Sequence, residues 1–351
     1  MFTSLKKKIV LRGMEKRKKE NPFDINYADN YKLSEDATSD INNSHYFCIQ
    51  SFETKEVLFY RSAKRGSDGV DEVWLVYRDL NGDIYMAEKD HYQKNEKNPT
   101  TINCLEPGKK MEFIYKGFVK KAKLTDKGYV VDEESLKIPF QLNGIFYGTS
   151  KIFEFTQHMD SNVTASAIAK EKLSRKIQDA FNEIYQVHYE QGGKADLNIK
   201  IGNKKDIMKG YPAIRDHSYG KRNWDFFDRY VWSIIMLENG DFVHTSFMRY
   251  PVLTELQAGF YLNDEMISVK KSNKMDSMPI IGTTPNEFSM DVEYGNGTKK
   301  HIIGKLDFVC PFYFEGDFNV NEGVCEYIVD GIKGKGIGEF AFNKDQKRWT
   351  R

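Results

Sequence analysis

The same pair of strand and turn signals occurs twice in this chain, 158 residues apart. A Val-Trp pair at 73–74 precedes Asn-Gly-Asp at 81–83, and a second pair at 231–232 precedes Asn-Gly-Asp at 239–241. Asn-Gly between apolar runs is a strong signal for a β-hairpin. The recurrence therefore predicts two copies of one β architecture. Chance recurrence stays open as the alternative, because both elements are common strand and turn chemistry.

The length and the aromatic content favour two all-β domains. At 351 residues the chain exceeds what one hydrophobic core usually organises. Its 24 Phe and 20 Tyr favour strands, because aromatic side chains fit a pleated, half-buried surface. We therefore predict an all-β chain of two tandem β-barrel or β-sandwich domains, joined by one α-helix.

The connecting helix is predicted between the two halves. Asp160 or Ser161 caps its start, and its apolar residues at helical spacing are Leu173, Ile177, Phe181 and Ile184. Its single apolar face suggests that it packs onto a barrel. The predicted organisation is a basic N-terminal arm at 1–40, a first β domain at 41–160, the connecting helix at 161–185 and a second β domain at 186–351.

Charge and cysteine content argue against several classes of protein. The chain has 52 Lys or Arg and 51 Asp or Glu, so no global field would attract nucleic acid, and we expect no nucleic-acid partner. The four cysteines lie far apart without a Cys-x-x-Cys pair, which argues against a zinc site and favours reduced thiols. No apolar run is long enough for a membrane span or a signal peptide, so we expect a cytoplasmic location.

The first twenty residues carry eight Lys or Arg. They surround a short apolar group, which consists of Leu5, Ile9, Val10 and Leu11. We interpret the segment as a solvated arm. The alternative is a basic amphipathic helix in weak contact with a membrane surface.

The densest polar and aromatic cluster is the run 215–224, Arg-Asp-His-Ser-Tyr-Gly-Lys-Arg-Asn-Trp. A carboxylate beside an imidazole can position a base and tune its pKa, so Asp216 and His217 are candidate catalytic residues. In an extended strand, however, Asp216 and His217 face opposite ways. We therefore expect one of the two in a cavity and the other in a structural network, for which Arg222 is a candidate partner. A purely structural corner stays open.

A second cluster, His188-Tyr189-Glu190-Gln191, precedes two glycines and reads as a strand that ends in a turn. His188 and Glu190 share one face of such a strand. If that face looks into an apolar barrel, the ionised form of Glu190 is disfavoured and Glu190 could serve as a proton donor. The alternative is a strand-end carboxylate paired with a nearby basic residue.

A glycine-rich run at 334–338 resembles a phosphate-binding loop but lacks the terminal Lys-Ser/Thr and the following helix. We predict instead a strand that packs closely against another backbone, with Glu339 as a candidate pocket carboxylate. The signatures of zinc proteases, α/β-hydrolases and kinases are missing from the sequence. We expect no metal site.

Together, the 188–191 strand, the 215–224 corner and the late glycine-rich strand resemble the AttH and carotenoid 1,2-hydratase superfamily. Tyr219 and Asn223 stand at variable positions of that family's corner motif. The resemblance implies two lipocalin-like β domains with an apolar cavity, and relatives that act on polyenes without a redox cofactor. Expected contacts to a hydrophobic ligand are Tyr189, Arg215, Tyr219, Trp224, Trp232, His244 and Glu339.

The leading functional hypothesis is a cofactor-independent enzyme that protonates, hydrates, isomerises or cyclises an isoprenoid or other polyene. Asp216 is the favoured acid, with His217 as its partner or as a second polar contact. The first alternative is a non-catalytic carrier whose cavity binds a lipid or hydrophobic metabolite. The second alternative is a structural or partner-binding protein with a collapsed pocket.

Overall fold

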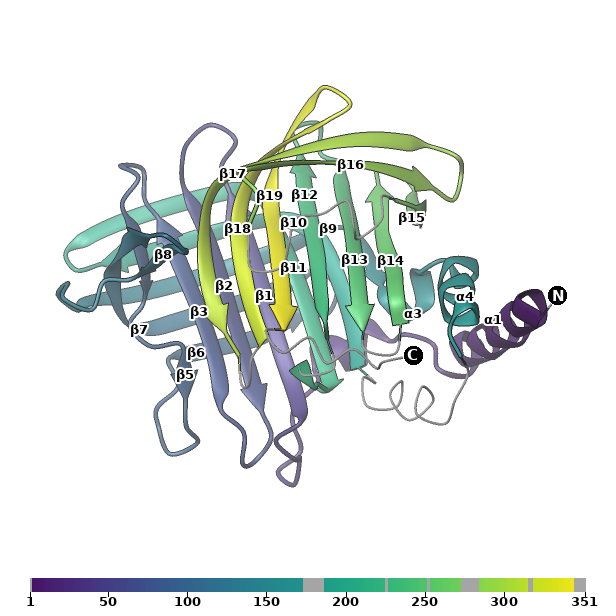
Figure 1. Ribbon diagram of the computed structural model, residues 1–351. Helices are drawn as coiled ribbons and strands as arrows, with labels where there is room; N and C mark the ends of the chain where they lie inside the picture. The colour runs from purple at the N-terminus through teal and green to yellow at the C-terminus, as the bar shows by residue number, and fades with distance from the viewer. Residues whose placement is uncertain are drawn as a thin grey trace. The chain divides into compact units, whose positions relative to one another are not determined.

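The computed structural model describes residues 2–172, 186–224, 227–250, 253–272, 284–314 and 318–343. Strands dominate this part of the chain (Figure 1), which confirms the expected all-β class. The chain divides into two compact units. We call them the N-terminal barrel unit (24–152 and 186–222) and the C-terminal barrel unit (1–23, 153–185 and 223–351).

The N-terminal barrel unit holds one short helix and an 11-stranded sheet in its described part. The helix is α2 (Ile25–Asp29), and the strands are β1 (Ile41–Gln50), β2 (Val57–Arg65), β3 (Asp71–Arg78), β4 (Ile84–Ala87), β5 (His91–Tyr92), β6 (Thr100–Glu106), β7 (Lys110–Thr125), β8 (Gly128–Val131), β9 (Ile138–Glu154), β10 (Gln186–Ile201) and β11 (Lys204–Lys221). The order β2-β1-β11-β10-β9-β7-β4-β3 returns to its start through a β2–β3 pairing, so the sheet closes on itself.

The C-terminal barrel unit is a closed barrel with three helices in its described part. The barrel order is β12-β13-β14-β15-β16-β17-β18-β19, and β19 pairs with β12. The helices are α1 (Phe2–Glu20), α3 (Phe155–His158) and α4 (Ser161–Lys170), and the strands are β12 (Arg229–Leu237), β13 (Phe242–Tyr250), β14 (Leu253–Leu262), β15 (Met266–Lys271), β16 (Glu287–Tyr294), β17 (Lys299–Tyr313), β18 (Phe318–Val329) and β19 (Ile332–Asn343).

The two predicted hairpins form, and their turns are built alike. Asp79 N–H donates to Asp83 O at 3.0 Å, and 158 residues later Leu237 N–H donates to Asp241 O at 2.8 Å. Gly82 and Gly240 adopt φ values of 89° and 94°, the left-handed region that glycine enters without a steric penalty. The hairpin is β3–β4 in the first barrel and β12–β13 in the second, so it holds a different place in the chain order of each barrel.

The structure divides the chain differently from the sequence-based boundaries. The strands β10 and β11 were expected to open the second domain, but they belong to the N-terminal barrel unit. The reason is their pairing: β11 lies antiparallel to β1, with Ile41 opposite Lys221 and Ile49 opposite Ala213. The remaining part of the predicted second domain, from residue 223, forms the C-terminal barrel unit together with the helices α1, α3 and α4.

The helices also refine the expected arm and connector. The predicted arm at 1–40 contains α1 and α2, which fall in different units. Asp160 caps α4 by accepting from Asn162 N–H and Val163 N–H, and α4 packs on β14 as expected. The apolar residues predicted for the rest of the connecting helix, from Leu173 onward, lie outside the described residues. Within the described ranges, no helix is both long and apolar enough to cross a membrane.

Alternation along the strands of the N-terminal barrel gives β1, β10 and β11 an inner and an outer face. Phe47 and Ile49 of β1, Ala213 of β11 and Leu197 of β10 face the inside and belong to the apolar core. Aromatic rings fill that core, and the rings of Phe47 and Phe113 stack with centroids 4.3 Å apart. Further along the same inner face, the apolar side chains give way to a buried polar network.

Candidate functional site

The β10–β11 hairpin carries the site on its two faces. Tyr189 lies opposite His217 and faces the inside of the barrel, whereas Glu190 lies opposite Asp216 and faces the outside. This confirms that Asp216 and His217 point to opposite faces of their strand. It also confirms that His188 and Glu190 share a face, but that face is the outer one, so Glu190 does not enter the barrel core.

The inner face is anchored by a buried ion pair between Arg215 and Asp29. The two guanidinium nitrogens of Arg215 donate to the two carboxylate oxygens of Asp29 at 2.6 and 3.1 Å, and Arg215 Nε donates to Gln191 Oε1 at 2.9 Å. Both side chains of the pair are almost fully buried. Burial raises the pKa of Asp29, but the hydrogen bond and charge of Arg215 outweigh it and hold the pKa below its usual value.

A chain of hydrogen bonds extends this ion pair to His217. Tyr189 Oη contacts both Asp29 Oδ1 and His217 Nδ1, the latter at 2.7 Å. His217 Nε2 lies 2.8 Å from Asn43 Oδ1, and Asn43 donates its amide to Tyr31 O at 3.1 Å. Because Asn43 Oδ1 only accepts, His217 carries its proton on Nε2 when neutral, so Nδ1 is an acceptor. The Tyr189 hydroxyl has one proton, so it donates a hydrogen bond to either His217 Nδ1 or Asp29 Oδ1.

His45 completes the inner network by stacking on His217, with ring centroids 3.7 Å apart. Burial lowers the pKa of His45 to about 3, and the nearby Arg215 charge acts in the same direction. Burial likewise lowers the pKa of His217 well below its usual value, with added repulsion from His45 and Arg215. Both imidazoles are thus neutral at pH 7. The inner face therefore holds a buried, hydrogen-bonded polar network.

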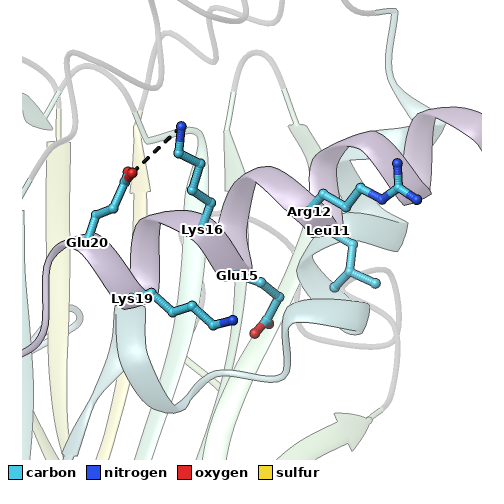
Figure 2. Close-up of a pocket in the computed structure, with 6 residues that line it drawn as sticks. All are labelled: Leu11, Arg12, Glu15, Lys16, Lys19 and Glu20. Carbon is cyan, nitrogen blue, oxygen red and sulfur yellow. Dashed lines mark ion pairs between the residues drawn. The ribbon is translucent and has the colours of Figure 1, made fainter.

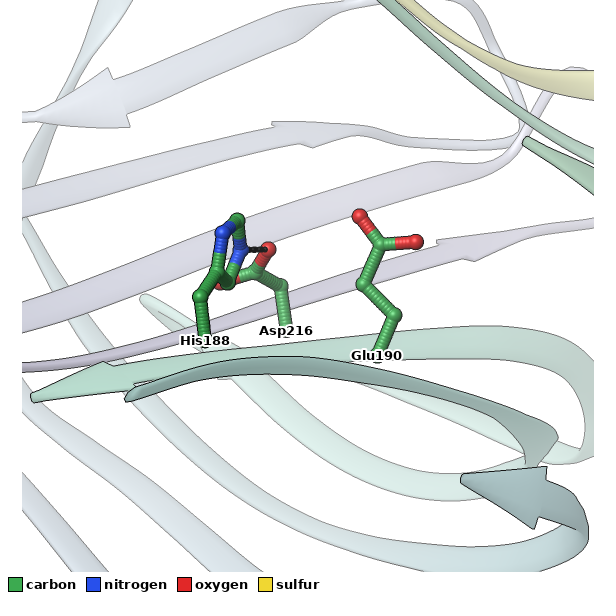
Figure 3. A group of neighbouring side chains, drawn as sticks. All are labelled: His188, Glu190 and Asp216. Atoms are coloured by element: carbon green, nitrogen blue, oxygen red, sulfur yellow. Dashed lines mark hydrogen bonds and ion pairs between the residues drawn. The ribbon is translucent and has the colours of Figure 1, made fainter. Parts of the chain in front are cut away.

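The outer face carries His188, Glu190 and Asp216 (Figure 3). His188 Nε2 contacts Asp216 Oδ2, its diagonal neighbour on β11, and the Glu190 side chain lies opposite Asp216 on the same face. The His188 and Asp216 side chains are 18% and 21% exposed, whereas Glu190 is only 1% exposed. The pair is therefore the part of this cluster that solvent reaches.

The outer pair is electrostatically poised for proton transfer. Burial lowers the pKa of His188, but the charge and hydrogen bond of Asp216 outweigh it, with Glu190 adding to the effect, and raise the pKa above its usual value. An imidazolium near neutral pH, held by a carboxylate, can give a proton to a bound molecule and take one back.

The same three side chains also have the chemistry of a cation site. His188, Glu190 and Asp216 each offer one ligand atom, and these atoms lie within 4.8 Å of one another. An imidazole with two carboxylates suits a divalent transition metal. The His188–Asp216 hydrogen bond already accounts for the closeness of two of the three side chains without a bound cation.

The remaining expected ligand contacts are split between the units. Tyr219 lies on the inner face of β11 and stacks on Tyr31, with centroids 4.1 Å apart. In the C-terminal barrel unit, Trp224 stacks on Phe314, with centroids 4.0 Å apart. On the outer face of that barrel, the rings of Trp232 and His244 pack edge to face, with centroids 4.3 Å apart. Glu339 accepts a hydrogen bond from Tyr230. Residues from both units were thus expected in one pocket, but none of these ligand contacts belongs to the outer-face cluster, which consists of His188, Glu190 and Asp216.

The glycine-rich run forms the strand β19, as the sequence analysis predicted. A Cβ atom on Gly336 would lie 1.9 Å from Ile234 O of the neighbouring strand β12. A side chain at this position is therefore sterically excluded, and the glycine serves backbone packing rather than phosphate binding.

Three residues of the inner network were missed by the sequence analysis: Asp29, Asn43 and His45. Asp29 falls in the basic N-terminal arm predicted at 1–40, and its partner Arg215 lies 186 residues further on. No local pattern indicates such a contact. Asn43 and His45 are placed by the β1–β11 register, which sequence alone does not give.

Comparison with solved structures finds the same fold at low sequence identity. Kievitone hydratase from Nectria haematococca is 10% identical with a TM-score of 0.50, covering 90% of this chain and 94% of that one. A putative AttH from Nitrosomonas europaea is 10% identical with a TM-score of 0.52, covering 90% and 95%. CghA with Sch210972 is 8% identical with a TM-score of 0.51, covering 86% and 88%. These neighbours confirm the resemblance to the AttH-like superfamily at the level of the fold.

In the comparison with curated proteins, no sequence matched this chain. The comparison with family models gave one match, a domain of unknown function (DUF7064), over residues 28–344. The match spans both barrel units and includes Asp29, the β10–β11 hairpin and the C-terminal strands. The protein therefore belongs to the DUF7064 family.

Proposed function

We propose that this protein is an enzyme that moves a proton onto or off an unsaturated carbon of a lipophilic molecule. The observation that carries the proposal is the partly exposed His188–Asp216 pair, with the buried Glu190 beside it on the same face. Asp216 was the favoured acid in the sequence analysis. Its partner in the proposal is now His188, because His217 lies on the other face of the hairpin.

The proposed chemistry is addition of water across a carbon–carbon double bond, or its reversal. The His188 imidazolium gives its proton to one carbon, while Asp216 keeps its negative charge and stabilises the positive charge that develops on the other carbon. The oxygen of water bonds to the other carbon, and Glu190 accepts the proton that this water loses. After the product is released, the proton returns from Glu190 to His188, so each cycle consumes only the alkene and one water molecule. Without water, the same protonation would start an isomerisation or a cyclisation.

The substrate class rests on the fold. One structural neighbour is named a hydratase, and the superfamily that the sequence resembles includes hydratases of polyenes. We therefore propose an isoprenoid or related polyene as the substrate. The Tyr189, Arg215 and Tyr219 side chains face the barrel inside, so in this proposal they support the hairpin rather than contact the substrate.

The test begins with native mass spectrometry of the purified chain and extraction of any retained molecule. That molecule and a panel of isoprenoid and polyene alkenes are then incubated with the protein in deuterated, oxygen-18-labelled water. We expect incorporation of deuterium at carbon, and of labelled oxygen if the reaction is a hydration. Asp216→Asn and His188→Gln should each lower the rate by about a hundredfold to ten-thousandfold.

The chain offers a matched control in the exposed His301–Asp291 pair, which has an Nδ1–Oδ1 distance of 2.7 Å. His301→Gln and Asp291→Asn should leave the rate unchanged. A protein that binds one of these alkenes but incorporates no isotope would instead support the carrier alternative and contradict the enzyme.

A further inference from the structure

Helix α1 presents an exposed cationic stripe. Arg12, Lys16 and Lys19 follow Leu5 and Ile9 at helical spacing, so all five side chains share one side of the helix. All five are exposed, and Leu5 and Ile9 are each 59% exposed. Figure 2 shows Arg12, Lys16 and Lys19, the basic end of this stripe, at a surface hollow that is lined by Leu11, Arg12, Glu15, Lys16, Lys19 and Glu20.

The opposite side of α1 is fixed to its own unit. Lys6 Nζ donates to Glu171 O at 3.2 Å and Lys18 Nζ donates to Met159 O at 2.9 Å, so both ends of the helix are tied to the segment around α4. The helix also packs along α4. The stripe is therefore held in place as a surface of a folded unit. The ion pair between Lys16 Nζ and Glu20 Oε1, at 3.6 Å, joins two well-exposed side chains, and such a pair contributes little to stability.

We infer that this stripe docks the protein on an anionic lipid surface. Its cations match negatively charged headgroups, and Leu5 and Ile9 lie one turn apart where the stripe begins, so both can enter the acyl boundary together. A nucleic acid would match the charge but would leave the two aliphatic side chains without a role. This inference does not rest on the proposed reaction.

The test is sedimentation of the full chain with phosphatidylcholine vesicles that either contain or lack phosphatidylserine. We expect binding that needs phosphatidylserine and weakens as salt rises. Each basic residue near such a surface strengthens binding roughly fivefold, so Arg12→Gln/Lys16→Gln/Lys19→Gln should bind about a hundredfold more weakly. Near-ultraviolet circular dichroism checks that the variant is folded.

The matched control removes the same charge elsewhere. Lys204, Lys205 and Lys209 are exposed at the β10–β11 turn, beside Ile207, which is 53% exposed. Their triple change to Gln should leave vesicle binding within about twofold. Equal losses in both triple variants would overturn the proposal, as would a wild-type chain that ignores phosphatidylserine vesicles. Binding of short RNA or DNA through α1 without vesicle binding would overturn it in favour of a nucleic-acid surface.

A second variant isolates the aliphatic part of the stripe. Leu5→Ser/Ile9→Ser keeps every charge and should bind the phosphatidylserine vesicles several-fold more weakly, since less apolar area enters the bilayer boundary. Unchanged binding by this variant would overturn the proposed insertion of the two side chains.

Discussion

The two faces of the β10–β11 hairpin use similar residues in opposite ways. On the inner face, Arg215 and His217 belong to a network in which the ion pair is fully buried and the imidazole is neutral. On the outer face, His188 and Asp216 form a partly exposed pair in which the carboxylate favours the imidazolium. The difference shows that burial and partners, not residue type, separate a structural corner from a reactive pair.

This comparison predicts that changes on the inner face cost stability. Arg215→Met removes one partner of the buried ion pair and leaves the Asp29 carboxylate without its guanidinium. We expect the free energy of unfolding to fall by about 3–5 kcal/mol, measured by urea denaturation.

A double variant distinguishes the stability lost with the ion pair from the free-energy cost of leaving the Asp29 carboxylate buried and unpaired. Asp29→Leu/Arg215→Met removes both charges and should recover much of the stability. If the double variant is as unstable as Arg215→Met, the unpaired carboxylate is not the cause. The inner network would then contribute mainly through its packing.

The faces should also respond to pH in opposite directions. The pKa of His45 is lowered to about 3 from 6.5, so the unfolded chain takes up a proton that the folded chain refuses. The stability from a neutral His45 is present above pH 6.5 and is lost as the pH falls toward 3. Lowering the pH to about 5 should cost roughly 2 kcal/mol through this group, and His45→Phe should remove that loss.

His188 gives the contrasting slope. Because its pKa is raised, its contribution to stability is present below its unfolded-state pKa and is lost as the pH rises through its folded-state pKa. Urea denaturation of the wild type, His45→Phe and His188→Gln at several pH values measures how the stability that each histidine contributes changes with pH. If both contributions rise with pH, or both fall, the assignment of the two faces is contradicted.

Strand alternation was the part of the site that sequence reasoning could supply. It separated Asp216 from His217 and joined His188 to Glu190, because a period of two is dictated by the extended backbone. It could not say which face looks inward, since that depends on the closed pairing of β11 with β1. The His188–Asp216 contact follows from the β10–β11 register and not from any local motif.

The fold class was predictable and the division of the chain was not. Two Asn-Gly turns and an aromatic-rich composition were enough to indicate two β domains. The boundary near residue 186 followed the expected helix. The structure instead pairs β11 with β1, more than a hundred residues earlier, and places β10 between β11 and β9 in the same sheet. Such long-range pairing leaves no trace in a window of neighbouring residues, and the same is true of Asp29 and Arg215.

The measurement that tests the account most directly is the titration of the His188 imidazole by NMR in the wild type and in Asp216→Asn. We predict that His188 titrates above its usual pKa of 6.5 in the wild type. Without the Asp216 charge, burial should dominate and lower the pKa below that value. A wild-type His188 that titrates at or below 6.5, or one that Asp216→Asn leaves unchanged, would contradict the poised acid–base pair on which the proposed function rests.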